Sequence, residues 1–336
     1  MKALVRNENG EIRIADIPEP YILKEDEVKI RVLYSAFCRD DMRYEDKTDV
    51  FSHIGVVGHE VVGVIEELGS YAQYAGFSLE DTVLVLPWES CGKCENCLSQ
   101  RTQCCTEAHV VMGTMTKHII RASRQLIKLD SDITFKQAVL MEPVGGVIEG
   151  LSKLPIDYDK EVLIIGAGFT GLVFVKLLKM RGVKNITVIE PIAARRKQAI
   201  SYGADYAVNP DAENFQLKLT TCCQYDGFDI VIETSSSIRM LESAVSFLTR
   251  GGTLEIFTYY GSLETISFSA LDMYASNITV IWSSFCSMGS IKTAARVIKR
   301  ESLEKLITAE YDFNHVLQAF EKYKTYEHIK IGIKNF

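Results

Sequence analysis

The stretch EVLIIGAGFTGLVFVKLLKM, residues 161–180, decides the fold of this 336-residue chain. Its first five residues, 161–165, are an apolar run that predicts a buried strand. Residues 172–180 have the apolar pattern of a helix, which we expect to end before Gly182. Between the two lies Gly166-Ala-Gly168-Phe-Thr-Gly171, which has the spacing of the G-x-G-x-x-G turn. A glycine-rich turn between a strand and a helix is the context in which this motif binds a dinucleotide.

The same turn predicts how a dinucleotide would be held. The first glycine makes the tight turn, the second lets a pyrophosphate approach the backbone, and the third allows close packing of helix and strand. Glu190 ends the next predicted strand, 24 residues after Gly166, where an acid would bind the ribose and favour NAD over NADP. Arg195 and Arg196 would instead favour NADP, since a basic side chain there would accept its 2′-phosphate. We expect NAD, held by Gly166, Gly168, Phe169, Thr170, Gly171, Glu190 and Arg195.

Strands and helices alternate around this motif, which predicts an α/β fold with a parallel sheet. Further strands are expected at 186–189, 229–232 and 253–257, and a helix at 194–202. The first third is different: short β-type runs at 28–34, 61–68 and 82–86 predict a twisted, partly closed β domain. Helical patterns at 292–299 and 315–322 and a strand at 329–333 follow. We expect domains at 1–144 and 145–285, and a C-terminal segment, 286–336, that returns to the first domain.

Size and charge exclude several classes of protein. A mass of 37.7 kDa exceeds what one hydrophobic core usually supports, so two domains are expected. The 44 acidic residues outnumber the 37 Lys and Arg, and a net charge of −7 argues against nucleic-acid binding. The longest apolar run, 162–175, contains three glycines and is shorter than the roughly 20 residues of a spanning helix. With no signal-peptide pattern at the N-terminus, we expect no membrane association and a cytoplasmic location.

Five of the nine cysteines fall within 15 residues. Cys91-Gly-Lys-Cys94-Glu-Asn-Cys97, followed by Cys104-Cys105, has the spacing of a four-thiolate zinc site. Such cysteines in a cytoplasmic protein are better candidates for metal ligands than for disulfides. Spacing alone leaves either Cys104 or Cys105 as the fourth ligand. A site closed by four cysteines has no position for a substrate, so we expect a structural zinc in a lobe at about residues 88–106.

Taken together, the motifs resemble those of the zinc-dependent medium-chain alcohol dehydrogenases, and among them the sorbitol and polyol dehydrogenase branch. The resemblance covers nearly the whole chain and consists of ordered motifs: Cys38, Gly58-His59-Glu60, the cysteine lobe, Glu142-Pro143 and the turn at 166–171. It implies a GroES-like catalytic domain interrupted by a Rossmann domain, with a catalytic zinc in the cleft between them. It also favours Cys105 as the fourth ligand in the lobe, and suggests a homodimer or homotetramer.

By this resemblance, Cys38 and His59 are ligands of the catalytic zinc. Glu60 and Glu142 are the carboxylates that bind the metal or exchange as its ligands. Zinc would hold and acidify the substrate hydroxyl, and hydride would pass to the nicotinamide. The implied activity is NAD-dependent oxidation of a secondary hydroxyl on a polyol, cyclitol, aminocyclitol or amino alcohol. The alternatives are an NADP-dependent reductase of an aldehyde or ketone and a non-catalytic nucleotide-sensing or assembly protein.

Two segments depart from the family pattern. Cys38-Arg39-Asp40-Asp41 places a carboxylate, Asp40, where the family has a proton-relaying hydroxyl. Asp40 would accept the alcohol proton or bind a second hydroxyl or an amino group, unless it only caps the turn that follows. Arg39 and Arg43 are its available cations, and Arg43 and Tyr44 are candidate substrate contacts. Met115-Thr116-Lys117-His118 replaces an aromatic-Ala-Glu-Tyr pattern, which predicts an altered substrate channel.

One apolar run has two interpretations. Ile278–Trp282 is suited to an edge strand that pairs between subunits, and equally to a core strand.

Overall fold

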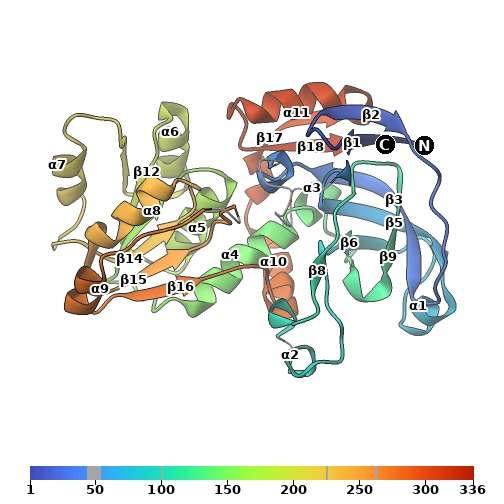
Figure 1. The fold of residues 1–336 in the computed structure, drawn as a ribbon, viewed down its shortest axis with the longest axis horizontal. Coiled ribbons are helices and arrows are strands. Elements are labelled where there is room, and N and C mark those ends of the chain that lie inside the picture. The colour runs from blue at the N-terminus through green and yellow to red at the C-terminus, as the bar shows by residue number, and fades with distance from the viewer. Residues whose placement is uncertain (44–53, 100, 225, 262–263) are drawn as a thin grey trace. The chain divides into compact units, whose positions relative to one another are not determined.

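The computed structural model describes residues 1–43, 54–99, 101–224, 226–261 and 264–336 of the chain (Figure 1). These residues form two compact units, one of residues 1–142 and 287–336 and the other of residues 143–286. The boundaries fall at 142/143 and 286/287, compared with the expected 144/145 and 285/286. Among the described residues, no helix combines the length and the apolar character needed to cross a bilayer.

The second unit is built on a six-stranded parallel sheet. Its strand order is β13 (Tyr206–Val208), β12 (Asn185–Ile189), β11 (Glu161–Ile165), β14 (Phe228–Glu233), β15 (Leu248–Ile256) and β16 (Thr279–Trp282). The connecting helices are α5 (Phe169–Met180), α6 (Ala193–Tyr202), α7 (Phe215–Thr220), α8 (Ile238–Ala244) and α9 (Ala270–Ser276). The order reverses beside β11, and a doubly wound sheet binds its ligands at such a switch point. This is the Rossmann arrangement that the glycine turn predicts.

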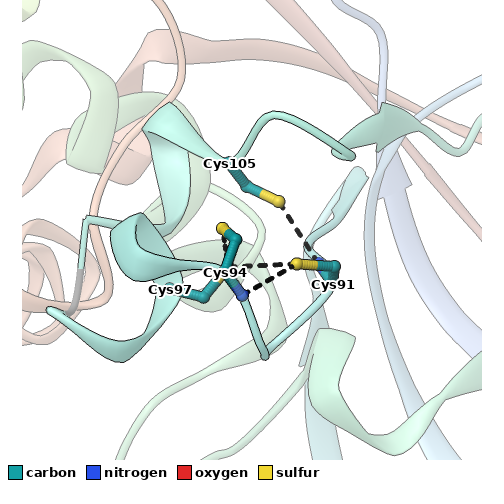
Figure 2. A group of neighbouring side chains, drawn as sticks. All are labelled: Cys91, Cys94, Cys97 and Cys105. Atoms are coloured by element: carbon teal, nitrogen blue, oxygen red, sulfur yellow. Dashed lines mark hydrogen bonds between the residues drawn. The ribbon is translucent and has the colours of Figure 1, made fainter.

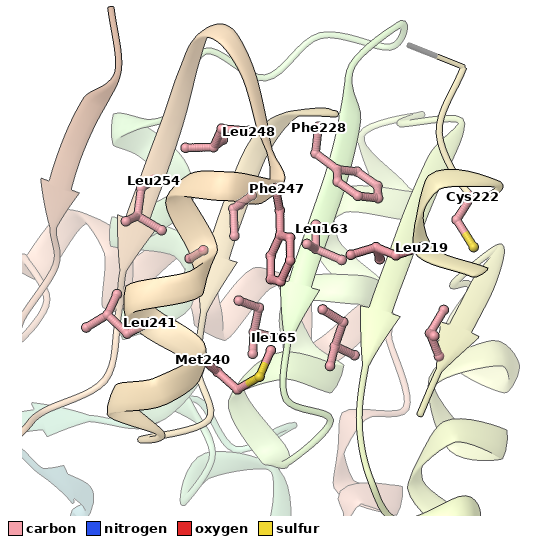
Figure 3. Packing of buried hydrophobic residues seen from close by; sticks show 14 of the residues in the cluster. Leu163, Ile165, Leu219, Cys222, Phe228, Met240, Leu241, Phe247, Leu248 and Leu254 are labelled. Carbon is pink, nitrogen blue, oxygen red and sulfur yellow. The ribbon is translucent and has the colours of Figure 1, made fainter. Parts of the chain in front are cut away.

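Apolar strands make the core of this unit. All five residues of β11 are buried, as expected for a parallel strand covered on both faces. Leu163 and Ile165 of β11 pack with Phe228 and Phe247 in one cluster (Figure 3). Helix α5 begins at Phe169, three residues before the expected start, because Gly168 already serves as its N-cap. The run at 278–282 forms β16 at the edge of the sheet, where Trp282 is 54% exposed, so it is an edge strand and not a core strand.

The first unit contains a larger, mixed sheet. Its order is β10 (Leu126–Lys128), β6 (Thr82–Val85), β5 (Glu60–Leu68), β3 (Glu27–Ala36), β18 (Lys330–Lys334) and β17 (Ile307–Asp312), with β9 (His118–Ala122) also paired to β3. Buried residues alternate with partly exposed ones along β3, the pattern of a sheet with one face on the core. Strand β18 pairs with β3 through Gly332 and Ala36, so the C-terminal segment is part of the first unit.

Smaller elements complete the first unit. One three-stranded sheet contains β2 (Ile12–Asp16), β1 (Lys2–Arg6) and β4 (Gly55–Val56), and a two-stranded one contains β7 (Trp88–Glu89) and β8 (His109–Val110). The helices are α1 (Ser70–Tyr74), α2 (Glu95–Leu98), α3 (Phe135–Ala138), α10 (Met288–Arg300) and α11 (Val316–Lys324). Helix α4 (Met141–Lys153) contains the boundary between the two units.

One buried acid in the Rossmann unit is poorly compensated. Glu255 of β15 is fully buried, and within the part of the chain that the structure describes neither of its carboxylate oxygens has a hydrogen-bond partner. Burial raises the pKa of Glu255 to about 7, while the Ser283 hydroxyl and the Lys153 ammonium oppose the shift. The folded state therefore binds a proton that the unfolded chain releases at lower pH. The stability contributed by protonated Glu255 is present below the ordinary glutamate pKa and is lost as the pH rises through about 7.

We expect Glu255→Gln to remove this pH dependence, because the amide stays neutral. Relative to wild type, the free energy of unfolding of the variant should rise by up to about 3 kcal/mol between pH 5 and pH 8. Chemical denaturation at the two pH values measures this difference, with the exposed Glu264→Gln as the matched control. An equal effect of Glu255→Gln at both pH values would contradict the prediction.

Candidate active site and metal centres

Four cysteines of the predicted lobe converge on one point (Figure 2). The sulfur atoms of Cys91, Cys94, Cys97 and Cys105 all lie within 4.8 Å of one another. The Cys91–Cys97 and Cys94–Cys97 separations are 3.9 and 3.5 Å. A tetrahedral zinc with Zn–S bonds of about 2.3 Å requires sulfur atoms about 3.8 Å apart. The donor set and its spacing therefore fit zinc, and the group contains Cys105 while the exposed Cys104 lies outside it.

Hydrogen bonds from backbone amides also stabilise negative charge on these sulfurs. The amide of Cys91 donates to the sulfur of Cys105 and the amide of Cys94 to that of Cys91, both at 3.3 Å. The backbone amide of Cys97 lowers the pKa of Cys94 to about 6. Burial and the neighbouring sulfurs instead raise the pKa of Cys97 to about 12. Since a metal binds the thiolate form, metal binding here would have to displace the proton that Cys97 holds.

A second group of metal-ligand type consists of Cys38, His59 and Glu60. One ligand atom from each lies within 4.8 Å of the others. Antiparallel pairing of Ala36 in β3 with Glu60 in β5 brings the end of one strand to the start of the other. Gly58 makes the turn into β5 with φ +95°, and a Cβ there would lie 2.6 Å from the Thr114 hydroxyl, so only glycine fits.

Asp41 holds two members of this group in place. One of its oxygens lies 2.8 Å from Nδ1 of His59, and the other accepts a hydrogen bond from the backbone amide of Cys38 at 2.8 Å. Asp41 is completely buried. A carboxylate on Nδ1 fixes the ring orientation and leaves Nε2 to face a metal, an arrangement common around zinc. Burial lowers the pKa of His59, but Asp41 and Cys38 raise it, and the net effect is a raised pKa.

A buried lysine neutralises Glu60. The ammonium of Lys330, in β18, donates to both carboxylate oxygens of Glu60 at 2.7 Å and also to the carbonyl of Phe37 at 3.3 Å. Burial raises the pKa of Glu60, and Lys330 counteracts that shift. Breaking a buried pair of this kind by removing one partner costs about 3–5 kcal/mol, because the other charge stays buried. The last strand of the chain is thus tied to the site by charge.

Two further acids lie at this site. Loss of solvent raises the pKa of Glu142 to about 7, and the charges of Glu60 and Asp40 add to the shift. Glu142 does not belong to the group within 4.8 Å. Asp40 has one oxygen 3.9 Å from the sulfur of Cys38. Burial, followed by Asp40, raises the pKa of Cys38 to about 11, so in the absence of metal this sulfur is a thiol.

The two arginines expected beside Asp40 have different positions. Arg43 pairs with Asp40 at 3.2 Å. The Arg39 guanidinium lies 4.1 and 4.0 Å from the ring centres of Tyr323 and Tyr326, and donates to the carbonyl of Tyr323. The turn after Cys38 is closed by Asp41 and not by the side chain of Asp40, which is the first residue of a short 3₁₀ turn. Tyr44, the other predicted substrate contact, lies outside the described residues.

The segment 115–118 has structural contacts in the first unit. Met115 is fully buried and packs with Leu4 and Phe37 in a core cluster. The hydroxyl of Thr116 donates to the carbonyl of Lys2. His118 pairs with Glu19 and Glu66.

The glycine turn of the second unit has the shape of a phosphate site. A Cβ on Gly168 would meet no atom within 4 Å, so space is open where a pyrophosphate would lie, at the N-terminus of the 12-residue helix α5. A Cβ on Gly171 would lie 2.0 Å from the carbonyl oxygen of Gly166, so the helix and the turn touch directly. Phe169 and Thr170 form the first turn of α5. These features fit a dinucleotide.

Glu190 is held beside this turn. Its two oxygens accept hydrogen bonds from the backbone amides of Ala167 and Ile192, each at 2.9 Å. Arg196 donates to the carbonyls of Glu190 and Pro191, and Arg195 is 8% exposed in α6. The acid is therefore fixed at the edge of the turn, while Arg196 already has main-chain partners.

Sequence reasoning overlooked two residues of the first unit, Asp41 and Lys330. Asp41 lies three positions after Cys38, and this short spacing to a possible metal ligand was the only sequence feature that could have indicated its role. Lys330 is a single charge within the apolar run Ile329–Ile333. A lysine at a buried strand position indicates an acidic partner, but the sequence does not identify Glu60, which is 270 residues away.

Comparison with known proteins agrees with this geometry. Residues 24–131 match the model of the alcohol dehydrogenase GroES-like domain, and residues 170–300 match that of the zinc-binding dehydrogenase domain. An L-threonine 3-dehydrogenase of Pyrococcus horikoshii is 27% identical, covering 96% of this chain and 94% of its own. A sorbitol dehydrogenase of Bacillus subtilis is 28% identical, covering 76% and 74%.

A solved structure has the same fold. Galactitol-1-phosphate dehydrogenase from Escherichia coli superposes with a TM-score of 0.87 over 99% of this chain and all of its own, at 22% identity. The two family models together span more than two thirds of the chain, in the order that a GroES-like domain followed by a Rossmann domain requires. The chain therefore belongs to the zinc-dependent medium-chain alcohol dehydrogenase family and is an oxidoreductase of that family.

Proposed function

We propose that this enzyme oxidises a secondary hydroxyl on a polar substrate to the ketone, with zinc in the active site and NAD as the hydride acceptor. The substrate class is a polyol, cyclitol, aminocyclitol or amino alcohol. The observation that carries the proposal is the group of Cys38, His59 and Glu60, with Asp41 fixing the imidazole. The names of the threonine and sorbitol dehydrogenase relatives support an amino alcohol or a polyol.

The residues of the first unit would have different roles in binding the metal. Cys38 and His59 would hold the metal, with Glu60 as the third ligand and Glu142 as the carboxylate that exchanges with it. Bound zinc would supply a Lewis acid for a hydroxyl oxygen, and bound nicotinamide would accept a hydride. Lys330 keeps the charge of Glu60 balanced whether or not Glu60 binds the metal.

Asp40 distinguishes this site from the family pattern, which has a hydroxyl at this position. Its carboxylate lies 3.9 Å from the sulfur of Cys38 and pairs with Arg43, so it is a charged group next to the proposed metal. We propose that it accepts the alcohol proton or binds a second hydroxyl or an amino group of the substrate. A carboxylate is a better partner for an ammonium or a polyol than for an aliphatic chain. This favours polar substrates over simple alcohols.

NAD is the proposed cofactor because Glu190 is fixed beside the glycine turn, where its charge would oppose a 2′-phosphate. The four cysteines of the lobe would bind a second, structural zinc. Thiolates of this kind persist in the reducing cytoplasm, where we expect the enzyme to act.

Removing a proposed catalytic ligand tests the activity. Wild type should contain two zinc ions per subunit and reduce NAD with members of a panel of polyols, aminocyclitols and threonine, followed by the absorbance of the reduced nicotinamide. Cys38→Ser should lose one zinc and at least about 100-fold in turnover, because a thiolate ligand is replaced by a hydroxyl. Cys104→Ser, the control, should keep both zinc ions and full activity. Unchanged turnover in Cys38→Ser would contradict the proposal, and one zinc with no turnover in wild type would favour a nucleotide sensor.

A substitution at Glu190 tests the choice of cofactor. Glu190→Ala should raise the KM for NAD about tenfold or more, because a hydrogen bond from the ribose to a charged acceptor is lost. The KM for NADP should fall, since a negative charge no longer opposes the 2′-phosphate. Steady-state kinetics with both cofactors measure this, with the exposed Glu213→Ala as control. Strong preference of wild type for NADP would instead favour the reductase alternative.

We further propose that the enzyme is a homodimer or homotetramer, with β16 in a subunit interface. Strand β16 is the edge of its sheet, and three exposed apolar side chains lie on it or on helix α9: Leu271 (72%), Tyr274 (87%) and Trp282 (54%). An open edge beside exposed apolar groups is a surface that another copy can cover.

A charge placed on this edge should dissociate the oligomer. We expect Trp282→Lys to reduce the solution mass measured by light scattering after size-exclusion chromatography, because burying an unpaired ammonium disfavours association. Tyr74→Lys, at an 88% exposed aromatic of the first unit, is the control and should leave the mass unchanged. An oligomer that persists in Trp282→Lys at micromolar concentration would place the interface elsewhere.

A further inference from the structure

The turn that follows β14 lies against the glycine turn that follows β11. The two strands are parallel neighbours, and Ile165, the last residue of β11, pairs with Glu233, the last residue of β14. Thr234 and Gly166 are therefore the first residues beyond the two paired ends. The strand order reverses at this position, and a doubly wound sheet receives its ligand there.

The side-chain hydroxyl of Thr234 is bonded to the start of the glycine turn. Its oxygen lies 2.8 Å from the carbonyl oxygen of Ile165 and 3.3 Å from that of Gly166. A hydroxyl has one proton, so the two carbonyls share it. A Cβ added to Gly166 would lie 3.0 Å from the same hydroxyl oxygen, and one added to Gly171 would lie 3.1 Å from it. One side chain therefore packs against the first and the third glycine of the motif.

The peptide unit between Gly166 and Ala167 is held at both ends. Its carbonyl oxygen accepts from Thr234, and its amide donates to a carboxylate oxygen of Glu190 at 2.9 Å. The amide of Gly166 donates to the carbonyl of Ile189 at 2.8 Å. Groups at the end of β12 therefore hold one side of the turn, and Thr234 holds the other. Because a peptide unit is planar, fixing its two ends fixes the direction in which the chain enters α5.

We propose that Thr234 is a positioning residue for the cofactor, whose hydroxyl keeps the glycine turn in the shape that receives the pyrophosphate. The proposal rests on the proposed function only in that a nicotinamide dinucleotide binds at this turn. Thr234 need not touch the cofactor, because it acts on the backbone that does. Backbone amides at a helix N-terminus bind phosphate groups, and a binding site of this kind depends on placement to within about 0.5 Å.

The substitution Thr234→Val removes the hydroxyl at nearly constant side-chain volume. A methyl carbon stays about 3.3 Å or more from a carbonyl oxygen, whereas the hydroxyl oxygen lies 2.8 Å from that of Ile165. The methyl would therefore push the turn away from β14, and the carbonyl of Gly166 would lose this donor. We expect the affinity for NADH to fall about tenfold, which corresponds to about 1.4 kcal/mol.

Equilibrium binding to the full-length enzyme tests the proposal. NADH binding is followed by the fluorescence of the reduced nicotinamide, and ADP-ribose and adenosine are measured by their displacement of NADH. Thr234→Val should weaken NADH and ADP-ribose by the same factor of about ten, because both contain the pyrophosphate, and should leave the affinity for adenosine unchanged. Thr234→Ser keeps the hydroxyl and should bind NADH within about threefold of wild type.

The chain offers a matched control in the same sheet. Thr187 of β12 is buried, and within the described part of the chain its hydroxyl has no hydrogen-bond partner. Thr187→Val should therefore keep the wild-type affinity for NADH. Thr234→Ala removes the hydroxyl without placing a methyl against the carbonyls and should weaken NADH at least about threefold, which keeps the test intact if Thr234→Val does not fold. Thermal unfolding of each ligand-free variant measures folding separately.

Two results would overturn the proposal. A lower unfolding midpoint in the valine and alanine variants, with wild-type affinity for NADH and ADP-ribose, would mean that Thr234 only stabilises the fold. A loss confined to NADH, with ADP-ribose unaffected, would place its role at the nicotinamide. NADPH is titrated in parallel. A wild type that prefers NADPH would refute the choice of NAD in the proposed function, and the comparison at Thr234 would then be decided with NADPH. A wild type that binds neither cofactor would refute both proposals.

Discussion

The candidate metal site around Cys38 and His59 depends on four carboxylates that lie close together, largely out of contact with water, and that each need compensation. Asp40, Asp41, Glu60 and Glu142 all act on the electrostatics of Cys38 and His59 or of one another. Each has its own compensation. Asp41 faces an imidazole, Glu60 faces an ammonium, Asp40 pairs with Arg43, and Glu142 has its pKa raised to about 7. Without these partners, four like charges would destabilise the fold at this point.

This constraint also explains the path of the chain. The lysine that balances Glu60 is supplied by β18, near the C-terminus, and the acid belongs to β5. The chain leaves the first unit for the whole of the Rossmann unit and then returns, and the returning strand pairs with β3 beside the site. Many apolar sequences could pack as a strand at this position. The buried Lys330–Glu60 pair gives the return a specific register, because a shift by one residue would turn Lys330 to the other face of the sheet.

The two departures from the family pattern turned out to have different roles. Asp40 lies at the candidate metal site, close to Cys38, where the departure was expected to matter. The segment 115–118 instead contributes to a core cluster and to a charged network with Glu19 and Glu66. A motif position predicts a role only when the surrounding fold is the same. The partners of these side chains, from Leu4 to Glu66, come from elements that the motif does not contain.

The sequence by itself determined the features that depend on local spacing. The glycine turn with its strand and helix, the four-cysteine lobe and several strands of each sheet follow from patterns within about 30 residues, because backbone conformation and short ligand loops are set by neighbours in the chain. The strands β9, β10, β13 and β17 were not predicted. Only the tertiary structure decided the contacts between distant segments. It showed that Cys105, and not Cys104, joins the other cysteines of the lobe, and that β16 lies at the edge of its sheet. It also showed that Asp41 contacts His59, that Lys330 pairs with Glu60, and that Arg43, and not Arg39, pairs with Asp40. These contacts form only when separate strands are brought into register, and a charge's partner is then fixed by distance in space, which residue order does not encode directly.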